Sequence, residues 1–287
     1  MNEIYHQGRL KPPGKALISP LDTGLLFGES LFETFPVYGG KPLFFKDHVE
    51  RLRRGCRLLH WPYLPTSEFK KAIGLFTKKY PKTHSFMVRF NLTQELVPPA
   101  GPRTFTFRRP VTFATARPLR HDIQAPQPPS GKAGISPWKT PHWRMFPTRF
   151  KTASYLTTRL TFREHPDWDE ILKLNDRGQV VDGGGATPFW YDGKSLWVPP
   201  LNLGGLESVT RKKVISLCRR LGLKVVERPW KPAQVSRKGE LFLAGSGVAL
   251  LRVTHLQGRP LKPALGLTSR LWRHYQGWAT TNTHFEF

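Results

Sequence analysis

A strand followed by a helix is predicted within residues 31–59, whose sequence is LFETFPVYGGKPLFFKDHVERLRRGCRLL. Residues 31–37 favour a strand. Residues 45–59 carry apolar side chains at the three-to-four-residue period of a helix that is buried on one face, namely Phe45, Val49, Leu52, Cys56 and Leu59. Asp47 and Glu50 have the spacing of a capping box, which places the start of this helix near them.

Further helices and strands alternate along the chain. The same periodicities predict helices at residues 67–80, 153–165 and 210–221, and strands at 85–93, 171–174, 179–182, 189–191, 195–198 and 224–227. Such interleaving is typical of an α+β or mixed α/β fold. The chain has 287 residues, 39% of them hydrophobic and 12% aromatic, which is enough for one large or two modest packed domains and excludes a disordered protein.

The domain organisation is predicted from a change in composition. Residues 124–141 are rich in Pro, Gly, Ser and Lys, and we expect them to form an interdomain linker. A smaller N-terminal α/β domain at residues 1–123 and a larger C-terminal domain at residues 142–287 would then flank this linker.

Several classes of protein and site are disfavoured. Apolar stretches are only a handful of residues long, whereas about 20 are needed to cross a bilayer, so we expect no membrane span. Residues 1–10 lack the apolar core of a secretory signal, from which we predict a cytoplasmic location. Cys56 and Cys218 each fall within a helical apolar pattern, which favours buried thiols over a disulfide or a metal site.

The chain carries 45 Lys and Arg against 20 Asp and Glu, a formal net charge of +25. This excess makes a polyanionic partner a serious alternative. The basic residues are nevertheless dispersed as short pairs and triplets, without a long basic tail. A solvated basic surface is therefore favoured over the steering of a small anionic substrate and over nucleic-acid binding.

Four local motifs could carry chemistry, although each also has an ordinary structural interpretation. Gly24 and Gly28 allow a tight turn ahead of the first strand. Lys151 precedes an apolar helix, and an amine held in a cleft can become a nucleophile towards carbonyl groups. Residues 206–211, LESVTR, begin a helix and could bind a phosphate, while residues 244–247, AGSG, could bind an anion through backbone amides.

The order and spacing of these motifs resemble the class IV aminotransferase family of fold-type IV pyridoxal phosphate (PLP) enzymes, over about residues 15–260. Within that family the chain is most similar to aminodeoxychorismate lyases. The similarity is carried by the segments ISPLD at 18–22, FETF at 32–35, GGKP at 39–42, HVERL at 48–52 and FW at 189–190. The resemblance implies a two-domain fold like that of D-amino acid aminotransferases, and a homodimer with its active site between domains.

The resemblance also implies a role for particular residues. Lys151 matches the lysine that binds PLP covalently and later moves protons, and Arg51 matches the arginine that binds the PLP phosphate. The expected phosphate ligands further along the chain are Val209, Thr210, Ser246 and Gly247. Together these residues would supply a cation, helix amides and hydroxyl groups to one dianionic phosphate.

At three positions the sequence departs from the family pattern. Asp182 replaces the glutamate that binds the pyridine nitrogen of PLP, so a carboxylate is retained but its reach is one methylene shorter. Thr187 replaces an asparagine, and Ser208 replaces the glycine before the phosphate-binding pair. These changes affect the expected geometry around the cofactor.

The resemblance implies that the enzyme converts 4-amino-4-deoxychorismate to 4-aminobenzoate and pyruvate, a step of folate biosynthesis. The partner would thus be a small anionic amine, with Lys151 as the proton acceptor and with Phe32, Thr34 and Arg89 as candidate substrate residues.

An aminotransferase acting on branched-chain or D-amino acids is the alternative. Two features disfavour the D-amino acid version: Phe32 stands where those enzymes have tyrosine, and residues 93–105 lack their paired Arg and His. A lesser alternative is a non-catalytic, basic nucleic-acid-binding paralogue.

Overall fold

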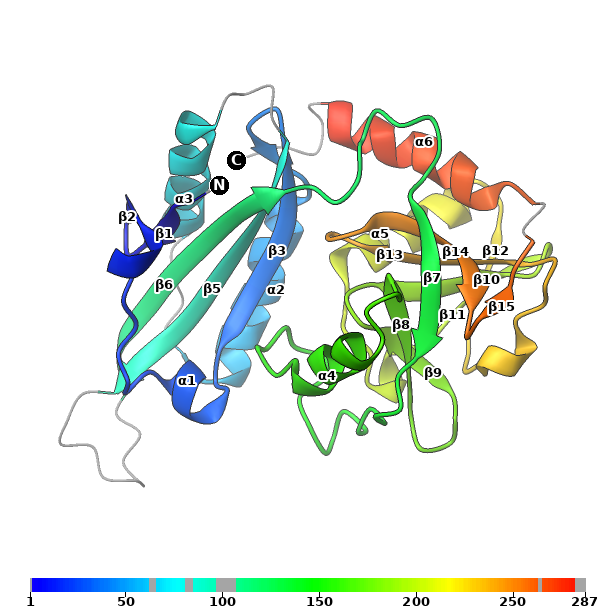
Figure 1. Ribbon diagram of the computed structural model, residues 1–287, viewed down its shortest axis with the longest axis horizontal. Helices are drawn as coiled ribbons and strands as arrows, with labels where there is room; N and C mark the ends of the chain where they lie inside the picture. The colour runs from blue at the N-terminus through cyan, green and yellow to red at the C-terminus, as the bar shows by residue number, and fades with distance from the viewer. Residues whose placement is uncertain (1, 62–65, 81–84, 97–106, 263–264, 282–287) are drawn as a thin grey trace. The chain divides into compact units, whose positions relative to one another are not determined.

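The computed structural model describes residues 2–61, 66–80, 85–96, 107–262 and 265–281. Two compact units are formed by the described residues of this chain (Figure 1). Unit 1 contains Met1–Leu119, Phe150–Ser154 and Thr280–Phe287, and unit 2 contains Arg120–Arg149 and Tyr155–Ala279. Residues 97–105, part of the segment used above against a D-amino acid aminotransferase, lie outside the described residues.

Unit 1 is built on an antiparallel sheet whose described strands have the order β2-β1-β6-β5-β3-β4. The strands are β1 (Ile4–His6), β2 (Arg9–Lys11), β3 (Leu31–Tyr38), β4 (Lys41–Pro42), β5 (Phe86–Leu96) and β6 (Phe107–Pro118). The helices are α1 (Thr23–Phe27), α2 (Phe45–Leu58) and α3 (Thr66–Lys79). The apolar faces of α2 and α3 pack with the sheet in one core that contains Phe35, Phe69 and Phe90.

Unit 2 is built on a mixed sheet with the described order β12-β11-β10-β13-β14-β7-β8-β9, and β15 pairs with β14. Its strands are β7 (Ser130–Ile135), β8 (Glu170–Leu174), β9 (Val180–Gly183), β10 (Thr187–Tyr191), β11 (Ser195–Val198), β12 (Lys224–Glu227), β13 (Glu240–Gly245), β14 (Ala249–Leu256) and β15 (Arg259–Pro260). Its helices are α4 (Leu156–Glu164), α5 (Val209–Arg220) and α6 (Leu267–Thr280, whose last residue belongs to unit 1).

The predicted mixture of helices and strands is confirmed, and the strongly periodic segments form the expected elements. The predicted helix at residues 45–59 is α2, and the predicted strand at residues 85–93 is β5, which extends three residues further. The capping-box prediction is wrong, because α2 begins at Phe45, after Phe44 in a left-handed conformation, without a side-chain cap. The start of α2 is therefore fixed by packing of its buried apolar face rather than by Asp47.

Two segments differ from the prediction because of pairing between residues far apart in the sequence. Within the expected linker at residues 124–141, Ser130–Ile135 form β7 and pair in parallel with both β14 and β8. The helix expected at residues 153–165 begins only at Leu156, because Phe150–Ser154 run beside β3 in unit 1. The domain limits derived from composition stay a prediction.

Candidate active site

Lys151 is attached through its backbone to the first residues of β3. The Phe32 N–H donates a hydrogen bond to the Lys151 carbonyl at 2.9 Å, and the Ala153 N–H donates to the Ser30 carbonyl at 3.0 Å. Leu31 and Thr152 form an isolated antiparallel bridge between these two bonds. The short segment around Lys151 is thus held like a strand at one edge of the unit 1 sheet.

The side chain of Lys151 lies close to the aromatic ring of Phe32. Its Nζ is 4.5 Å from the ring centroid, and the guanidinium carbon of Arg89 is 3.6 Å from the same centroid. Arg89 lies on β5 directly opposite Thr34 of β3, and its Nε donates to Asn91 Oδ1 at 2.9 Å. Two cations therefore contact one buried ring. The structure brings together Lys151 and the three predicted substrate residues Phe32, Thr34 and Arg89.

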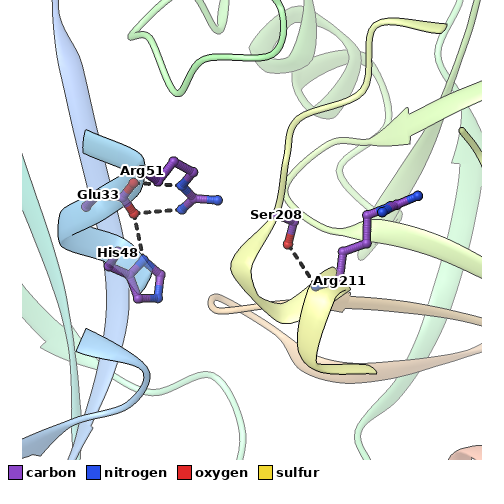
Figure 2. Close-up of polar contacts among 5 residues, drawn as sticks. All are labelled: Glu33, His48, Arg51, Ser208 and Arg211. Carbon is purple, nitrogen blue, oxygen red and sulfur yellow. Dashed lines mark hydrogen bonds and ion pairs between the residues drawn. The ribbon is translucent and has the colours of Figure 1, made fainter. Parts of the chain in front are cut away.

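Arg51 lies on α2 and binds the carboxylate of Glu33 on β3 (Figure 2). Its Nε donates to Oε1 at 2.7 Å and its Nη2 donates to Oε2 at 2.6 Å. His48 lies one helical turn before Arg51, and its Nδ1 is 2.7 Å from the same Oε2. All three side chains are buried. A sheet carboxylate thus orients two side chains of the helix that packs over it.

The charges in this cluster alter the pKa values of its members. Burial alone would raise the pKa of Glu33, but the charge of Arg51 and the hydrogen bonds from Arg51 and His48 outweigh it and lower that pKa to about 2. Burial lowers the pKa of His48, Glu33 opposes this change, and the positive charges of Arg51 and Lys151 add to it. The Lys151 amine thus contributes to the potential of the Arg51 cluster, and such a group of cations suits an anionic ligand.

Asp182 lies on β9 of unit 2 and is half-buried. Its Oδ2 accepts a hydrogen bond from the backbone N–H of Leu206 at 2.9 Å, and its Oδ1 accepts one from the N–H of Gly183 at 3.0 Å. These bonds fix the carboxylate beside the segment that leads into α5. A carboxylate oxygen has two lone pairs and can therefore accept more than one donor.

The predicted phosphate ligands Val209 and Thr210 are the first two residues of α5, and both are buried. Ser208 is the N-cap, and its Oγ accepts a hydrogen bond from the backbone N–H of Arg211 at 3.2 Å (Figure 2). The side chain of Arg211 binds the Pro199 carbonyl and the carboxylate of Glu227. The first turn of a helix presents N–H groups that favour anions, so this end of α5 has the chemistry that a phosphate requires.

Thr187, Ser246 and Gly247 are the remaining predicted cofactor ligands in unit 2. The Thr187 Oγ1 is buried and has no hydrogen-bond partner within the described residues. Ser246 and Gly247 form the turn between β13 and β14, and a Cβ placed on Gly247 would meet no atom within 4 Å. An unpaired buried hydroxyl and an open glycine turn fit a ligand with polar groups. The residues present in each unit thus fit PLP by their chemistry.

Two buried carboxylates were not predicted to have a role. Glu33 has a detectable signal in the sequence, because it is an acidic residue within a mostly apolar strand, followed by the His48 and Arg51 pair. Glu170 accepts backbone hydrogen bonds from Ile171, Gly184 and Gly185, and burial raises its pKa to about 7. Glu170 therefore holds the turn that follows Asp182, a role that no periodic pattern indicates.

Within the described part of the chain, no group of three or more His, Cys, Asp or Glu residues could hold a metal ion. Both cysteines are buried and free. The described helices are all too short or too polar to span a bilayer.

The chain matches the family described as amino-transferase class IV over residues 30–256. It belongs to the class IV aminotransferase family. The predicted family, its enzyme class and its PLP cofactor are thereby confirmed. The predicted fold, that of fold-type IV enzymes, is confirmed as well.

Similar proteins include both kinds of class IV enzyme considered above. The chain is 28% identical to a putative branched-chain-amino-acid aminotransferase of Methanocaldococcus jannaschii, covering 90% of this chain and 88% of that protein. It is 26% identical to the aminodeoxychorismate lyase of Bacillus subtilis, covering 88% and 86%. The crystal structure of a Thermoproteus uzoniensis branched-chain aminotransferase with norvaline has the same fold, with a TM-score of 0.82, 23% identity and coverage of 96% and 95%.

Proposed function

We propose that this class IV enzyme acts as an aminodeoxychorismate lyase, which converts 4-amino-4-deoxychorismate to 4-aminobenzoate and pyruvate. The observation that carries the proposal is the contact of both Lys151 and Arg89 with the ring of Phe32. An amine that can react with the cofactor lies on the same ring as a cation that can bind a carboxylate. The substrate carries an amine and two carboxylates, so it has the groups that this arrangement would bind.

Bound PLP supplies an aldehyde for reaction with amines and a ring that withdraws electrons. Lys151 would hold the cofactor covalently and, once released by the substrate amine, would take a proton from the carbon next to that amine. Arg89 would orient a substrate carboxylate. Phe32 would limit the access of water to Lys151, and Thr34, opposite Arg89, would line the same part of β3.

Arg51 would bind the phosphate of PLP in unit 1, while Val209, Thr210, Ser246 and Gly247 would bind phosphate in unit 2. Asp182 would accept a hydrogen bond from the protonated pyridine nitrogen, and its hydrogen bond from Leu206 would keep the carboxylate in a single orientation. Thr187 would supply its buried hydroxyl to the cofactor or to Asp182. Asp182 is the residue in which this chain departs most directly from the family. Its side chain is one methylene shorter than the glutamate of the family, so its carboxylate is expected to reach less far towards the cofactor.

A branched-chain aminotransferase is the second candidate, and the named relatives support it equally. The same lysine would then take a proton from the substrate carbon next to the amine and deliver it to the cofactor, which would keep the amino group, and a keto acid would be the second substrate. The two candidates share Lys151, Arg51 and Asp182. They differ in the product that leaves the enzyme.

Borohydride reduction followed by peptide mapping tests the proposed lysine. The PLP-loaded protein is expected to gain one phosphopyridoxyl group on Lys151, and Lys151→Ala is expected to lose it. Lys139→Ala removes an exposed lysine that lies close to Lys151 in the sequence and is expected to retain the label. Labelling of another lysine in the wild-type protein would refute the assignment.

Product analysis separates the two candidates. The lyase proposal predicts equal amounts of pyruvate and 4-aminobenzoate from 4-amino-4-deoxychorismate, with no keto acid added as a second substrate. The aminotransferase candidate predicts glutamate formation from a branched-chain amino acid and 2-oxoglutarate, and no aromatic product. If DNA or RNA binds with strong salt dependence while no lysine reacts with PLP, the non-catalytic alternative would replace both.

We also propose that the enzyme is a homodimer in the cytoplasm, as its family resemblance implies. Sedimentation equilibrium of the PLP-loaded protein would test the assembly, and a mass of one chain at micromolar concentration would exclude it. The two domains inferred from composition, with residues 124–141 between them, remain part of this proposal. Limited proteolysis would test whether cleavage falls within those residues, and β7 leads us to expect resistance between residues 130 and 135.

A further inference from the structure

We propose that Glu33 is a positioning residue for the phosphate group of PLP, and that it acts through the guanidinium group of Arg51. This inference rests on the proposed function, in which Arg51 binds that phosphate. It adds a residue that contacts neither cofactor nor substrate. Substitution of Glu33 is therefore expected to change the affinity only for ligands that carry a phosphate.

The contacts fix the direction of the Arg51 head group. Glu33 uses one oxygen for Nε and the other for Nη2, at 2.7 and 2.6 Å, so the two planar groups face each other side by side. Such bidentate pairing sets both the position and the plane of a guanidinium, whereas a single hydrogen bond would leave rotation free. His48 Nδ1, at 2.7 Å from Oε2, in turn fixes the carboxylate.

Burial makes this arrangement persistent. Glu33 is 0% exposed and Arg51 is 6% exposed. In any other rotamer the Arg51 guanidinium would lose its contact with Glu33 and leave two opposite charges buried without partners. Such rotamers are therefore costly in free energy. The rotational entropy of a long side chain is therefore lost on folding and not again when the phosphate binds.

The charge of Glu33 and the geometry that it imposes on Arg51 have opposite effects on phosphate binding. The negative charge of Glu33 partly cancels that of Arg51 and would by itself weaken the attraction of a phosphate. The fixed orientation of the guanidinium would strengthen it. Glu33→Asp separates the two effects, because the charge stays while the carboxylate is withdrawn by one methylene and can no longer reach both nitrogens of Arg51.

Equilibrium titration with PLP and with pyridoxal, which lacks the phosphate, tests the inference through tryptophan fluorescence. Glu33→Asp is expected to weaken PLP binding about tenfold or more, by analogy with the loss that follows mutation of residues that orient metal ligands. Pyridoxal affinity is expected to change less than twofold. On the Arg51→Gln background, Glu33→Asp is expected to cause no further loss of PLP affinity. Glu50→Asp, on the exposed face of α2, is the matched control and should leave both affinities unchanged.

The outcomes distinguish this inference from the proposed function. If Arg51→Gln weakens PLP and pyridoxal equally, the phosphate role of Arg51 is wrong and both ideas fail. If Arg51→Gln acts on PLP alone while Glu33→Asp acts on both ligands equally or on neither, only the inference fails. A loss of PLP affinity from Glu33→Asp that persists in the Arg51→Gln background would also overturn it.

A second pair of variants covers the case in which Glu33→Asp does not fold. Glu33→Gln combined with Arg51→Gln leaves neither charge buried without a partner, so it is compared with Arg51→Gln alone. Equal PLP affinities are expected, because Glu33 has nothing left to orient. A further PLP-specific loss in the double variant would show that Glu33 reaches the phosphate by another route and would overturn the inference.

Discussion

The Phe32 N–H donates to the carbonyl of Lys151, and this bond joins the start of β3 to a segment that lies far along the chain. The bridge between Leu31 and Thr152 continues the pairing. The backbone of Lys151 is therefore fixed by the sheet, while its side chain extends over the Phe32 ring. A reactive group on a sheet edge is placed more precisely than one on a free loop.

Arg89→Met is expected to raise KM for the substrate about 10- to 100-fold, because a charge-assisted hydrogen bond to a carboxylate contributes on the order of 1.5–3 kcal/mol. kcat is expected to change much less, since the proposed function has Arg89 orient the substrate and Lys151 move the proton. Steady-state kinetics of product release measures both constants. Arg117→Met is the matched control, because Arg117 is an exposed arginine of β6 whose Nη1 donates a hydrogen bond to the neighbouring Pro118 carbonyl. A loss confined to kcat would contradict the substrate role of Arg89.

The periodic elements could be predicted from the sequence because the spacing of their apolar residues shows which side chains are buried. The apolar face of α2 and the alternation in β5 are local patterns. β7 could not be predicted in the same way, because its residues Ser130–Ile135 are poor in apolar side chains. They form a strand because β14 and β8 supply backbone partners on both sides. Pairing between distant segments overrides local preference here.

The site was predicted only as far as residues could be recognised by type and spacing. Lys151 and Arg51 follow from the family resemblance, and the structure places both in unit 1. Glu33 was missed because its role depends on α2 packing over β3, which sets His48 and Arg51 against one carboxylate. The contact between Lys151 and Phe32 likewise depends on pairing between two segments that lie far apart in the sequence, which no local pattern predicts.

The paired carboxylate of Glu33 is expected to make the protein sensitive to acid. Its pKa is lowered from an ordinary 4.5 to about 2, so the stabilisation is complete above pH 4.5 and is lost as the pH falls through 2. The loss amounts to about 3 kcal/mol of unfolding free energy. Urea unfolding of the wild-type protein and of the Glu33→Gln, Arg51→Gln double variant between pH 2 and 6 measures it. Parallel pH curves for the two proteins would refute this prediction.

Glu240 is expected to stabilise the start of α6. Its carboxylate accepts hydrogen bonds from the Leu267 N–H at 2.8 Å, the Thr268 N–H at 2.7 Å and the Thr268 hydroxyl at 2.6 Å, and it is buried. Glu240→Gln replaces one acceptor oxygen by a donor that faces these donors, which is expected to cost about 2 kcal/mol. Urea unfolding provides the value, with the exposed Glu164→Gln as control. A cost no larger than that of the control would show that the capping bonds contribute nothing.

The two thiols are expected to be unreactive in the folded protein. Burial raises the pKa of Cys56 to about 11 and that of Cys218 to about 12, so the thiolate that reacts with disulfide reagents is scarce at pH 8. Titration with an aromatic disulfide should give little colour before denaturation and two equivalents after it. Rapid reaction of one thiol in the native protein would indicate that its helix opens readily.

Glu170 is expected to give a pH dependence of the opposite sign from that of Glu33. Burial raises its pKa from an ordinary 4.5 to about 7, so the folded protein holds a proton that the unfolded chain has released between these values. Its contribution to stability is complete below pH 4.5 and decreases as the pH rises to 7, by up to about 1.4 kcal/mol per pH unit. Urea unfolding of the wild-type protein and of Glu170→Gln across pH 4 to 8 tests this, because the variant cannot release that proton. The difference in unfolding free energy between the two proteins should shift in favour of Glu170→Gln as the pH rises. A constant difference over this range would mean that the backbone N–H groups of Ile171, Gly184 and Gly185 hold the carboxylate ionised throughout.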